Sequence, residues 1–115
     1  MIKIANYKDK RIITKNYPHT KQYLKRKGVL YIDEDNNEYK GFAFVQKRNV
    51  VNELNKMEEL ILAIEVFQEK DRNKGIASNI VKKIINDAQA NGSYQIIAYY
   101  QKNNVASHKL WIKNQ

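Results

Sequence analysis

A nearly continuous apolar run followed by a helical pattern constrains the fold of this chain more than any other feature. Leu60–Phe67 reads LILAIEVF, which has the length and composition of a strand buried on both faces. Ile76–Ala90 has apolar residues at helical spacing, and its predicted buried face consists of Ile76, Ile80, Val81, Ile84, Ile85 and Ala88. A second strand-like segment, Tyr94–Tyr100, follows. Strand, helix and strand in this order predict a parallel βαβ crossover.

The first half of the chain predicts strands that pair locally. Val29–Ile32 and Tyr39–Val45 are joined by the polar segment DEDNNE, which predicts a β-hairpin. The other predicted elements are a strand at Met1–Ala5, one or two helices within Asp9–Lys27, a loop at Asn49–Lys56 and a short helix at Val105–Lys113. The 115 residues contain no repeat or linker, so we expect a single mixed α+β domain, 1–115, on a mostly antiparallel sheet.

Two residues mark the limits of helices in the N-terminal segment. Pro18 suits the start of a helix, and Gly28 suits the end of one. The apolar residues of this segment predict a buried face made of Ile12, Ile13, Tyr17, Tyr23 and Leu24.

The positive charge of the chain is concentrated near its N-terminus. The net charge is +9, and residues 1–28 hold nine Lys or Arg against one acid, Asp9. Residues 29–115 hold twelve bases and eleven acids. Two interpretations stay open: a lysine-rich composition without function, and a basic surface for an acidic partner or nucleic acid.

The composition excludes several kinds of site. The chain has no cysteine, which excludes disulfides, thiolate metal sites and a cysteine nucleophile, and suits a cytoplasmic protein. No segment has the length of a membrane-spanning helix, and the first residues lack the apolar core of a signal peptide, so we expect no membrane partner.

No metal site is predicted. The segment DEDNNE resembles the start of a calcium-binding EF-hand loop, but Glu38 and Phe44 occupy the positions of the required glycine and bidentate glutamate. His19 and His108 lack the spacing of metal ligands, so surface or half-buried structural histidines are the better interpretation.

The turn before the long helix, RNKGIA, combines a glycine, a small residue and two bases. Gly75 and Ala77 allow main-chain N–H groups to approach an anion closely, and a helix N-terminus adds a favourable dipole. Arg72 and Lys74 add positive charge. No dinucleotide or phosphate-loop fingerprint matches. The turn predicts an anion site of pyrophosphate size, with a plain helix end among solvated bases as the alternative.

Together with its flanks, this turn resembles the coenzyme A motif of the GNAT superfamily of N-acetyltransferases. That motif is Arg or Gln, two residues, Gly, one residue, then Gly or Ala. Here it is matched by Arg72, Gly75 and Ala77, after a strand that ends near Val66. The match is short but specific for a strand, turn and helix in this order.

A second family motif lies near the C-terminus. It is Asn, two residues, Ser or Ala, two residues, Leu-Tyr, one residue, Lys. It is matched by Asn104, Ser107, Leu110 and Lys113, with Trp111 in place of the usual tyrosine. The resemblance covers residues 1–115 and implies the GNAT fold. The family usually continues into one or two more strands, so we expect these closing strands to be missing from a chain that ends at Gln115.

The resemblance implies acetyl-coenzyme A as cosubstrate. Main-chain groups of the turn would hold its pyrophosphate, the backbone near Val66 would pair with its pantetheine arm where the fourth and fifth strands splay apart, and Asn104 and Ser107 would line the far side of that slot. The cofactor-binding residues so implied are Val66, Arg72, Asn73, Lys74, Gly75, Ile76, Ala77, Asn104 and Ser107.

The implied reaction moves acetyl from a thioester to a primary amine, which needs a base to deprotonate the ammonium. Glu65 is the first candidate base, because strand alternation places it opposite the face of Val66 and Ile64. Glu59 has the same parity and is the second candidate. For either residue, the alternative is a structural carboxylate at the strand end that faces solvent or pairs with a lysine.

The reaction also needs a donor to protonate the departing thiolate. Trp111 stands where many family members have a tyrosine, and an indole cannot practically give up its proton. We therefore expect Tyr99, Tyr100, Ser107 or water to fill this role.

Three interpretations of function follow. The first is an acetyl-CoA-dependent N-acetyltransferase acting on an amine acceptor. We expect this acceptor on or near an acidic macromolecule, because the basic residues 1–28 correspond to helices that border the acceptor side in the family. The second is a coenzyme A-binding module of the same fold with little catalysis. The third is a nucleic-acid-binding protein without cofactor. A free edge at Tyr94–Tyr100 would further predict a homodimer.

Overall fold

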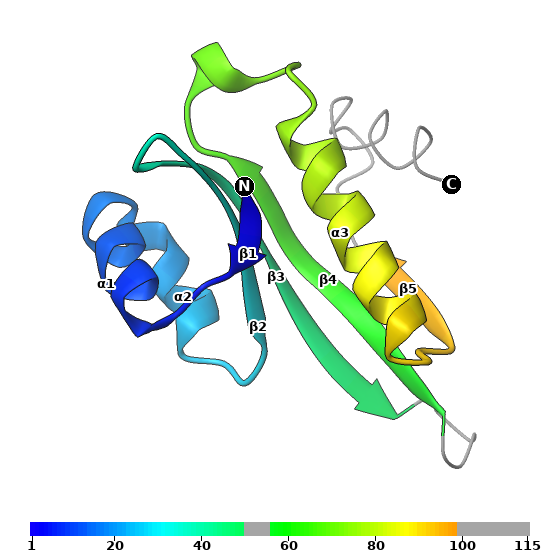
Figure 1. Cartoon of the computed structure of the whole chain (residues 1–115). Coiled ribbons are helices and arrows are strands. Elements are labelled where there is room, and N and C mark those ends of the chain that lie inside the picture. The colour runs from blue at the N-terminus through cyan, green and yellow to red at the C-terminus, as the bar shows by residue number, and fades with distance from the viewer. Residues whose placement is uncertain (50–55, 99–115) are drawn as a thin grey trace.

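Five strands form one mixed sheet in the computed structural model, which describes residues 1–49 and 56–98 (Figure 1). In sheet order they are β1 (Ile2–Ile4), β2 (Val29–Asp35), β3 (Glu38–Asn49), β4 (Met57–Val66) and β5 (Gln95–Ala98). β1 to β4 pair antiparallel, whereas β5 pairs parallel to β4. The predicted mixed α+β fold, with a mostly antiparallel sheet and one parallel crossover, is confirmed.

Helices cover both faces of this sheet (Figure 1). One face carries α1 (Tyr7–Asn16), the 3₁₀ turn η1 (Pro18–Thr20) and α2 (Lys21–Leu24). The other face carries α3 (Ile76–Ala90), which follows the 3₁₀ turn η2 (Glu69–Asp71) and connects β4 to β5. The sheet is therefore the middle of three layers.

Two apolar clusters, one on each face, hold the helices to the sheet. The cluster on the α1–α2 face includes Ile13, Leu30, Ile32, Phe42 and Phe44. The cluster on the α3 face includes Tyr31, Ala43, Val45, Ile61, Ile80 and Ile84. Neighbouring residues of β2 and β3 thus alternate between the two clusters, as expected for a sheet buried on both faces. Six of the residues predicted to be buried are only partly buried; they are Ile12, Tyr17, Tyr23, Leu24, Ile76 and Ile85.

The predicted hairpin between β2 and β3 is confirmed. Its two turn residues, Asn36 and Asn37, have positive φ angles of 51° and 64°. A two-residue type I′ turn requires this conformation, and asparagine tolerates it better than most residues. The polar composition of DEDNNE is thereby explained without a metal.

The first helix begins earlier than predicted, at Tyr7 rather than Asp9. Asn6 and Asp9 form a capping box at its N-terminus. The N–H of Asp9 donates to Asn6 Oδ1 at 2.9 Å, and the N–H of Asn6 donates to Asp9 Oδ2 at 3.0 Å. This motif satisfies two N–H groups at the helix start and fixes its position.

Gly28 does not end a helix, contrary to the prediction. α2 ends at Leu24, and Gly28 lies in the connection to β2. A Cβ atom at Gly28 would come within 2.5 Å of Phe44 Cζ and 2.8 Å of the Val45 carbonyl oxygen. Close packing against β3 therefore accounts for this glycine.

A β-bulge interrupts the alternation of side chains along β4. Phe44 lies opposite Ala63, but the next residue, Val45, lies opposite Ile61, so Leu62 is an extra residue in β4. Ile61 belongs to the cluster on the α3 face, whereas Ala63 packs with the cluster on the α1–α2 face. Residues of equal parity on the two sides of the bulge therefore point to opposite faces.

The limits of some elements differ from the prediction. β4 begins at Met57 rather than Leu60, and Asn49 belongs to β3 rather than to a loop. Residues 50–55, Tyr99 and Tyr100 of the predicted strand, and the predicted helix Val105–Lys113 lie outside the described residues. Within the described ranges, no helix is long and apolar enough to span a bilayer.

Candidate active site

A sharp turn leads from the end of β4 into the N-terminus of α3. The backbone enters the left-handed region at Asn73 (φ 64°) and at Gly75 (φ 82°), the N-cap residue of α3. Among the described residues, no side chain caps this helix end. The first N–H groups of a helix have no intrahelical partner, so at this end the main chain presents donors toward the turn.

The turn is open and positively charged. An added Cβ atom at Gly75 would meet nothing within 4 Å, so its positive φ, rather than crowding, requires glycine. That a side chain here would block a phosphate stays a prediction. Arg72 and Lys74 are exposed on the turn, and the first turn of α3 contains no acid. Open space, main-chain donors and flanking bases fit an anionic group.

Asp71, directly before the turn, forms an ion pair with Lys40 of β3, which also contacts Glu38 at 3.0 Å. The Asp71 side chain is buried, and its Oδ2 atom lies 3.6 Å from Lys40 Nζ. A hydrogen bond to Glu38 raises the pKa of Lys40 above its ordinary value, burial opposes this shift, and the charge of Asp71 adds to it. The Lys40–Asp71 pair ties η2 to the sheet beside the turn.

β3 and β4 meet closely at Gly41, beside the start of α3. A Cβ atom there would lie 2.7 Å from the Glu65 carbonyl oxygen and 3.3 Å from Ile76 Cγ2. Ile76 is the first residue of α3, so Gly41 sets how closely the helix N-terminus approaches the end of β4. No role was predicted for Gly41 from the sequence, although a glycine inside a predicted strand is itself a signal of close packing.

Glu65 points to the α1–α2 face, opposite Ile64, as predicted. It pairs across the sheet with Phe42 of the α1–α2 cluster, whereas Ile64 packs with the α3 cluster. His19 of η1 donates a hydrogen bond from Nε2 to Glu65 Oε2 at 2.6 Å. The side chains are 50% and 35% exposed, so the pair is accessible from solvent.

Aromatic rings stand beside this pair. Phe67, directly after β4, stacks on Tyr17 with ring centroids 3.8 Å apart, and on Phe42 at 5.5 Å. Tyr17 also meets the His19 ring edge-on at 6.4 Å. The stack fixes the end of β4 against the connection between α1 and α2.

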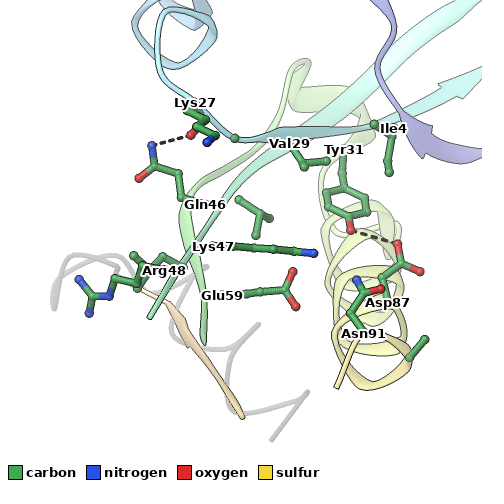
Figure 2. Close-up of a pocket in the computed structure, with 14 residues that line it drawn as sticks. Ile4, Lys27, Val29, Tyr31, Gln46, Lys47, Arg48, Glu59, Asp87 and Asn91 are labelled. Atoms are coloured by element: carbon green, nitrogen blue, oxygen red, sulfur yellow. Dashed lines mark hydrogen bonds between the residues drawn. The ribbon is translucent and has the colours of Figure 1, made fainter. Parts of the chain in front are cut away.

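Glu59, the second candidate base, does not share the face of Glu65, so its predicted orientation is wrong. The extra residue at the β4 bulge turns it to the α3 face, where Ser93 Oγ donates to its Oε2 at 2.8 Å. Glu59 is 1% exposed and lines a groove of about 780 Å³ together with Tyr31 and Asp87 (Figure 2). The sheet separates it from the Glu65 carboxylate.

A partly buried hydrogen bond between Tyr31 and Asp87 lines one side of that groove (Figure 2). Tyr31 O–H donates to Asp87 Oδ2 at 3.0 Å, and Lys83 Nζ donates to Asp87 Oδ1 at 2.9 Å. Burial, followed by the hydrogen bond to Asp87, raises the pKa of Tyr31 above its ordinary value. Tyr31 is thus held as a neutral donor that joins β2 to α3.

The remaining predicted site residues lie outside the described residues; they are Tyr99, Tyr100, Asn104, Ser107 and Trp111. The pairing of β4 with β5 is described as far as Ile61 opposite Ala98, so the expected splaying of these strands stays a prediction. Across residues 1–49 and 56–98, no group of three or more His, Asp or Glu side chains could hold a metal ion.

His19 is a candidate functional residue that the sequence did not reveal. It lies 46 positions before Glu65, and no local motif joins them. Their contact depends on η1 packing against the end of β4. A weak signal was Pro18, which stands at the start of η1 and fixes the turn that presents His19.

The sequence comparison agrees with this geometry. The model of the acetyltransferase (GNAT) family matches residues 5–114. The chain belongs to the GNAT family. No curated protein shows a significant sequence match to it. The family match spans both the turn at Gly75 and the C-terminal segment that carries the second motif.

Solved structures share the fold of this GNAT chain at low sequence identity. A probable acetyltransferase superposes with a TM-score of 0.83 at 13% identity, covering 99% of this chain and 87% of its own. A ribosomal-protein-alanine N-acetyltransferase from Brucella melitensis biovar Abortus 2308 has a TM-score of 0.81 at 13% identity, covering 99% and 90%. An aminoglycoside N-acetyltransferase in complex with CoA has a TM-score of 0.75 at 16% identity, covering 100% and 90%.

Proposed function

We propose that this GNAT protein transfers the acetyl group of acetyl-CoA to a primary amine. The observation that carries the proposal is the open turn before α3, where an uncapped helix N-terminus meets Arg72 and Lys74. Membership of the GNAT family supports the reaction type. A structural neighbour with CoA bound supports the choice of cosubstrate.

The residues of the turn fit the pyrophosphate of acetyl-CoA. Main-chain N–H groups of Gly75, Ile76 and Ala77 would donate to it, and the left-handed backbone at Asn73 and Gly75 exposes them. Arg72 and Lys74 add charge, the backbone of Val66 would pair with the pantetheine arm, and Asn104 and Ser107 would line the slot. When bound, acetyl-CoA supplies the thioester from which the acetyl group leaves.

We assign the base to Glu65. Its partly exposed carboxylate stands at the end of β4 on the α1–α2 face, next to Val66. Its negative charge would attract the acceptor ammonium. Tyr100 and Ser107 are the candidates to protonate the departing thiolate.

The acceptor we propose is an amine on or near an acidic macromolecule. Exposed bases of the N-terminal quarter lie on α1 and α2, the helices of the face to which Glu65 points, and on the segment that follows; they are Lys8, Arg11, Lys15, Lys21, Lys25, Arg26 and Lys27. Of these, Lys27 also lines the groove on the α3 face. A surface of exposed bases attracts anionic partners and repels polycations. Among the structural neighbours, one is named for a ribosomal-protein alanine and another for aminoglycosides. The positive charge of this surface favours a macromolecular acceptor over a polycationic aminoglycoside. We propose that this acceptor is cytoplasmic.

A second candidate function rests on the same basic surface. The chain would then be a GNAT-fold module that binds CoA or nucleic acid with little catalysis. Binding to nucleic acid through this surface would weaken steeply with added salt, because phosphate contacts release counterions.

The test is acetylation of a cell lysate by the purified protein with isotopically labelled acetyl-CoA, followed by mass spectrometry. Labelled acetyl groups on primary amines, concentrated in acidic proteins, would support the proposal. Glu65→Gln, which keeps the size of the side chain, should lower turnover by roughly 10²–10⁴-fold with acetyl-CoA affinity unchanged. Binding of acetyl-CoA without any labelled product would favour the non-catalytic module instead.

A further inference from the structure

The contact between His19 and Glu65 joins two titratable side chains from distant parts of the chain. His19 belongs to η1, between α1 and α2, and Glu65 lies near the end of β4. The atoms Nε2 and Oε2 are 2.6 Å apart. An ionised carboxylate can only accept hydrogen bonds, so the proton between these atoms belongs to Nε2 of the imidazole.

We propose that His19, held by Glu65, takes the proton from the acceptor ammonium. This rests on the proposed function and deepens it, because the base assigned to Glu65 becomes a pair. With Nε2 donating to Glu65, the lone pair is on Nδ1. Among the described residues, Nδ1 has no hydrogen-bond partner. Half of the His19 side chain is exposed, so the ring is accessible to an acceptor bound beside it.

The proton transfer balances within the pair. One N–H bond of the ammonium breaks, and a new N–H bond forms at Nδ1 of His19. The electron pair of the broken bond stays on the amine nitrogen, which becomes the nucleophile. Glu65 stays ionised throughout and stabilises the imidazolium that forms, as a carboxylate does for a catalytic histidine in hydrolases. The imidazolium then loses its proton to water before the next turnover.

The chemistry of the two side chains favours imidazole as the acceptor. An imidazole is intrinsically a stronger base than a carboxylate. A general base is most effective when it titrates near the working pH. A carboxylate alone is a weaker base than an imidazole whose positive form it stabilises, so the pair suits deprotonation of an ammonium near neutrality.

The surroundings of His19 leave this pair largely alone. The titratable groups that face it are Glu65 from β4 and Tyr17 from the end of α1, which meets the imidazole edge-on at 6.4 Å. Lys21, the nearest base along the chain, begins α2. Gln22 Nε2 donates to the carbonyl of His19 at 3.2 Å and holds the backbone. In the part of the chain that is described, no other ion pair involves His19 or Glu65.

Two substitutions of His19 test the proposal. His19→Gln keeps an N–H donor for Glu65 but cannot accept a proton, and His19→Ala leaves space for added imidazole. Both should lower kcat by about 10²–10⁴-fold, with the KM for acetyl-CoA unchanged. The fall of kcat/KM on acidification should move to lower pH in His19→Gln. Imidazole should restore activity to His19→Ala but not to His19→Gln.

Full activity in His19→Gln, with the pH profile of the wild type, would overturn the proposal and leave Glu65 as the sole base. A second readout needs no activity. The wild type should show a slowly exchanging imidazole N–H resonance by NMR, absent in both Glu65→Ala and His19→Gln. Its absence in the wild type would refute the pair even if acetylation occurs. If the resonance is present but no acetylation is found, the pair stands and the proposed function fails.

Discussion

Two glycines of this chain have the same conformation but different surroundings. Gly75 and Gly92 flank the two ends of α3, with φ angles of 82° and 72°. Neither would crowd a neighbour if a Cβ atom were added. Gly75 is at the N-terminus of α3, which favours anions, and Gly92 is at the C-terminus, which disfavours them. Gly92 is therefore a matched control for strain at Gly75.

The first prediction uses this match. Gly75→Glu and Gly92→Glu should each lose about 1–2 kcal/mol of folding free energy, because a side chain disfavours the left-handed backbone. Acetyl-CoA at a hundredfold excess over its Kd stabilises by about 2.7 kcal/mol. For a domain of this size that is a Tm rise on the order of ten degrees. Wild type and Gly92→Glu should show the rise in thermal denaturation, and Gly75→Glu should not.

Two outcomes would contradict this prediction. No rise in the wild type at millimolar acetyl-CoA would reject the cofactor. An equal rise in Gly75→Glu would place the pyrophosphate away from the turn, because a carboxylate cannot share the main-chain donors with a phosphate.

At the residue scale, the sequence predicted what depends on neighbours along the chain. The turn around Gly75 and the outward face of Glu65 follow from local spacing and from strand alternation. The contact of His19 with Glu65 could not be predicted, because it depends on how η1 packs against β4 through Tyr17 and Phe67.

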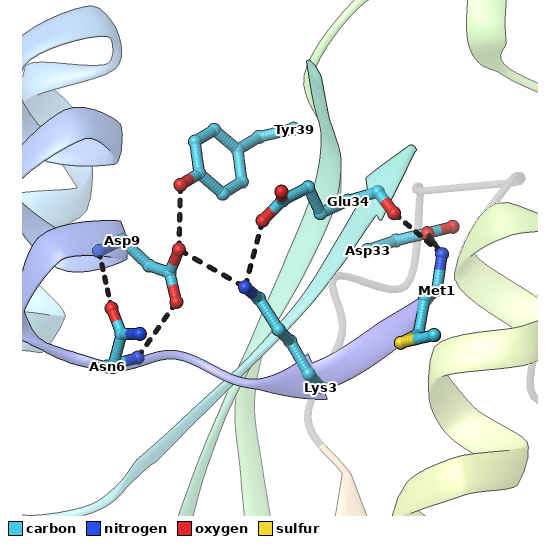
Figure 3. Close-up of polar contacts among 7 residues, drawn as sticks. All are labelled: Met1, Lys3, Asn6, Asp9, Asp33, Glu34 and Tyr39. Carbon is cyan, nitrogen blue, oxygen red and sulfur yellow. Dashed lines mark hydrogen bonds and ion pairs between the residues drawn. The ribbon is translucent and has the colours of Figure 1, made fainter. Parts of the chain in front are cut away.

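At the element scale, Asp9 joins α1 to two strands (Figure 3). Its carboxylate accepts the N–H of Asn6 at 3.0 Å and the O–H of Tyr39 at 2.7 Å, and Lys3 Nζ lies 3.4 Å away. Lys3 in turn reaches Glu34 Oε2 at 3.0 Å. One buried acid thus holds the helix start to β1 and β3.

These contacts shift two pKa values in opposite directions. Burial works to raise the pKa of Asp9, but hydrogen bonds from Asn6 and Tyr39 and the charge of Lys3 hold it below its ordinary value. Burial, followed by the hydrogen bond to Asp9, raises the pKa of Tyr39 to about 12. The folded chain therefore favours ionised Asp9 and a neutral tyrosine donor.

The second prediction follows from the direction of the Asp9 shift. The folded state depresses the pKa of Asp9. Its contribution to the free energy of unfolding is therefore complete above the unfolded-state pKa of about 3.9. This contribution is lost as the pH falls through the folded-state pKa. Asp9→Asn should cost about 1–3 kcal/mol at neutral pH, and the difference should shrink on acidification. Urea unfolding at several pH values measures this. The control Asp35→Asn, at the exposed end of β2, should change the free energy of unfolding little at any pH. If Asp9→Asn lost the same free energy at every pH, the electrostatic account would be refuted.

Most elements were predictable because apolar periodicity and turn residues mark them. The β4 bulge was not, since nothing in LILAIEVF shows which residue leaves the ladder. One extra residue, Leu62, is enough to send Glu59 and Glu65 to opposite faces of the sheet. Counting residues along a strand therefore predicts the direction of a side chain only between β-bulges. The prediction was correct for Glu65 relative to Ile64 because the bulge lies before both residues.

At the scale of the whole molecule, the sheet separates two different chemical environments. The α1–α2 face carries the His19–Glu65 pair, and α1 and α2 bear exposed bases such as Arg11 and Lys21. The α3 face has the groove with the carboxylates of Glu59 and Asp87. An anionic acceptor approaching the first face would be attracted by the bases, and Glu65 would then receive its amine. Bases also line the groove on the α3 face, namely Lys27, Lys47 and Arg48, so the two faces differ in which groups they present rather than in the sign of their charge.

The last prediction concerns the edge of the sheet. Within the described residues, β5 pairs with β4 on one side and has no strand on the other. Its residues include no Lys, Pro or Gly, and Ile96, Ile97 and Ala98 are partly exposed. Natural edge strands are commonly protected by such residues, and β1, at the opposite edge, is only three residues long and carries Lys3.

We therefore expect self-association through β5, which would offer a row of main-chain N–H and C=O groups to a second copy. Light scattering over a concentration series should show a rise in mass, and Ile97→Lys should abolish it by placing a charge in the paired edge. Ile4→Lys puts the same charge on the β1 edge, where Ile4 is 56% exposed, and should leave the association unchanged. A wild type that stays monomeric at high micromolar concentration would show that the β5 edge is protected by another part of the chain.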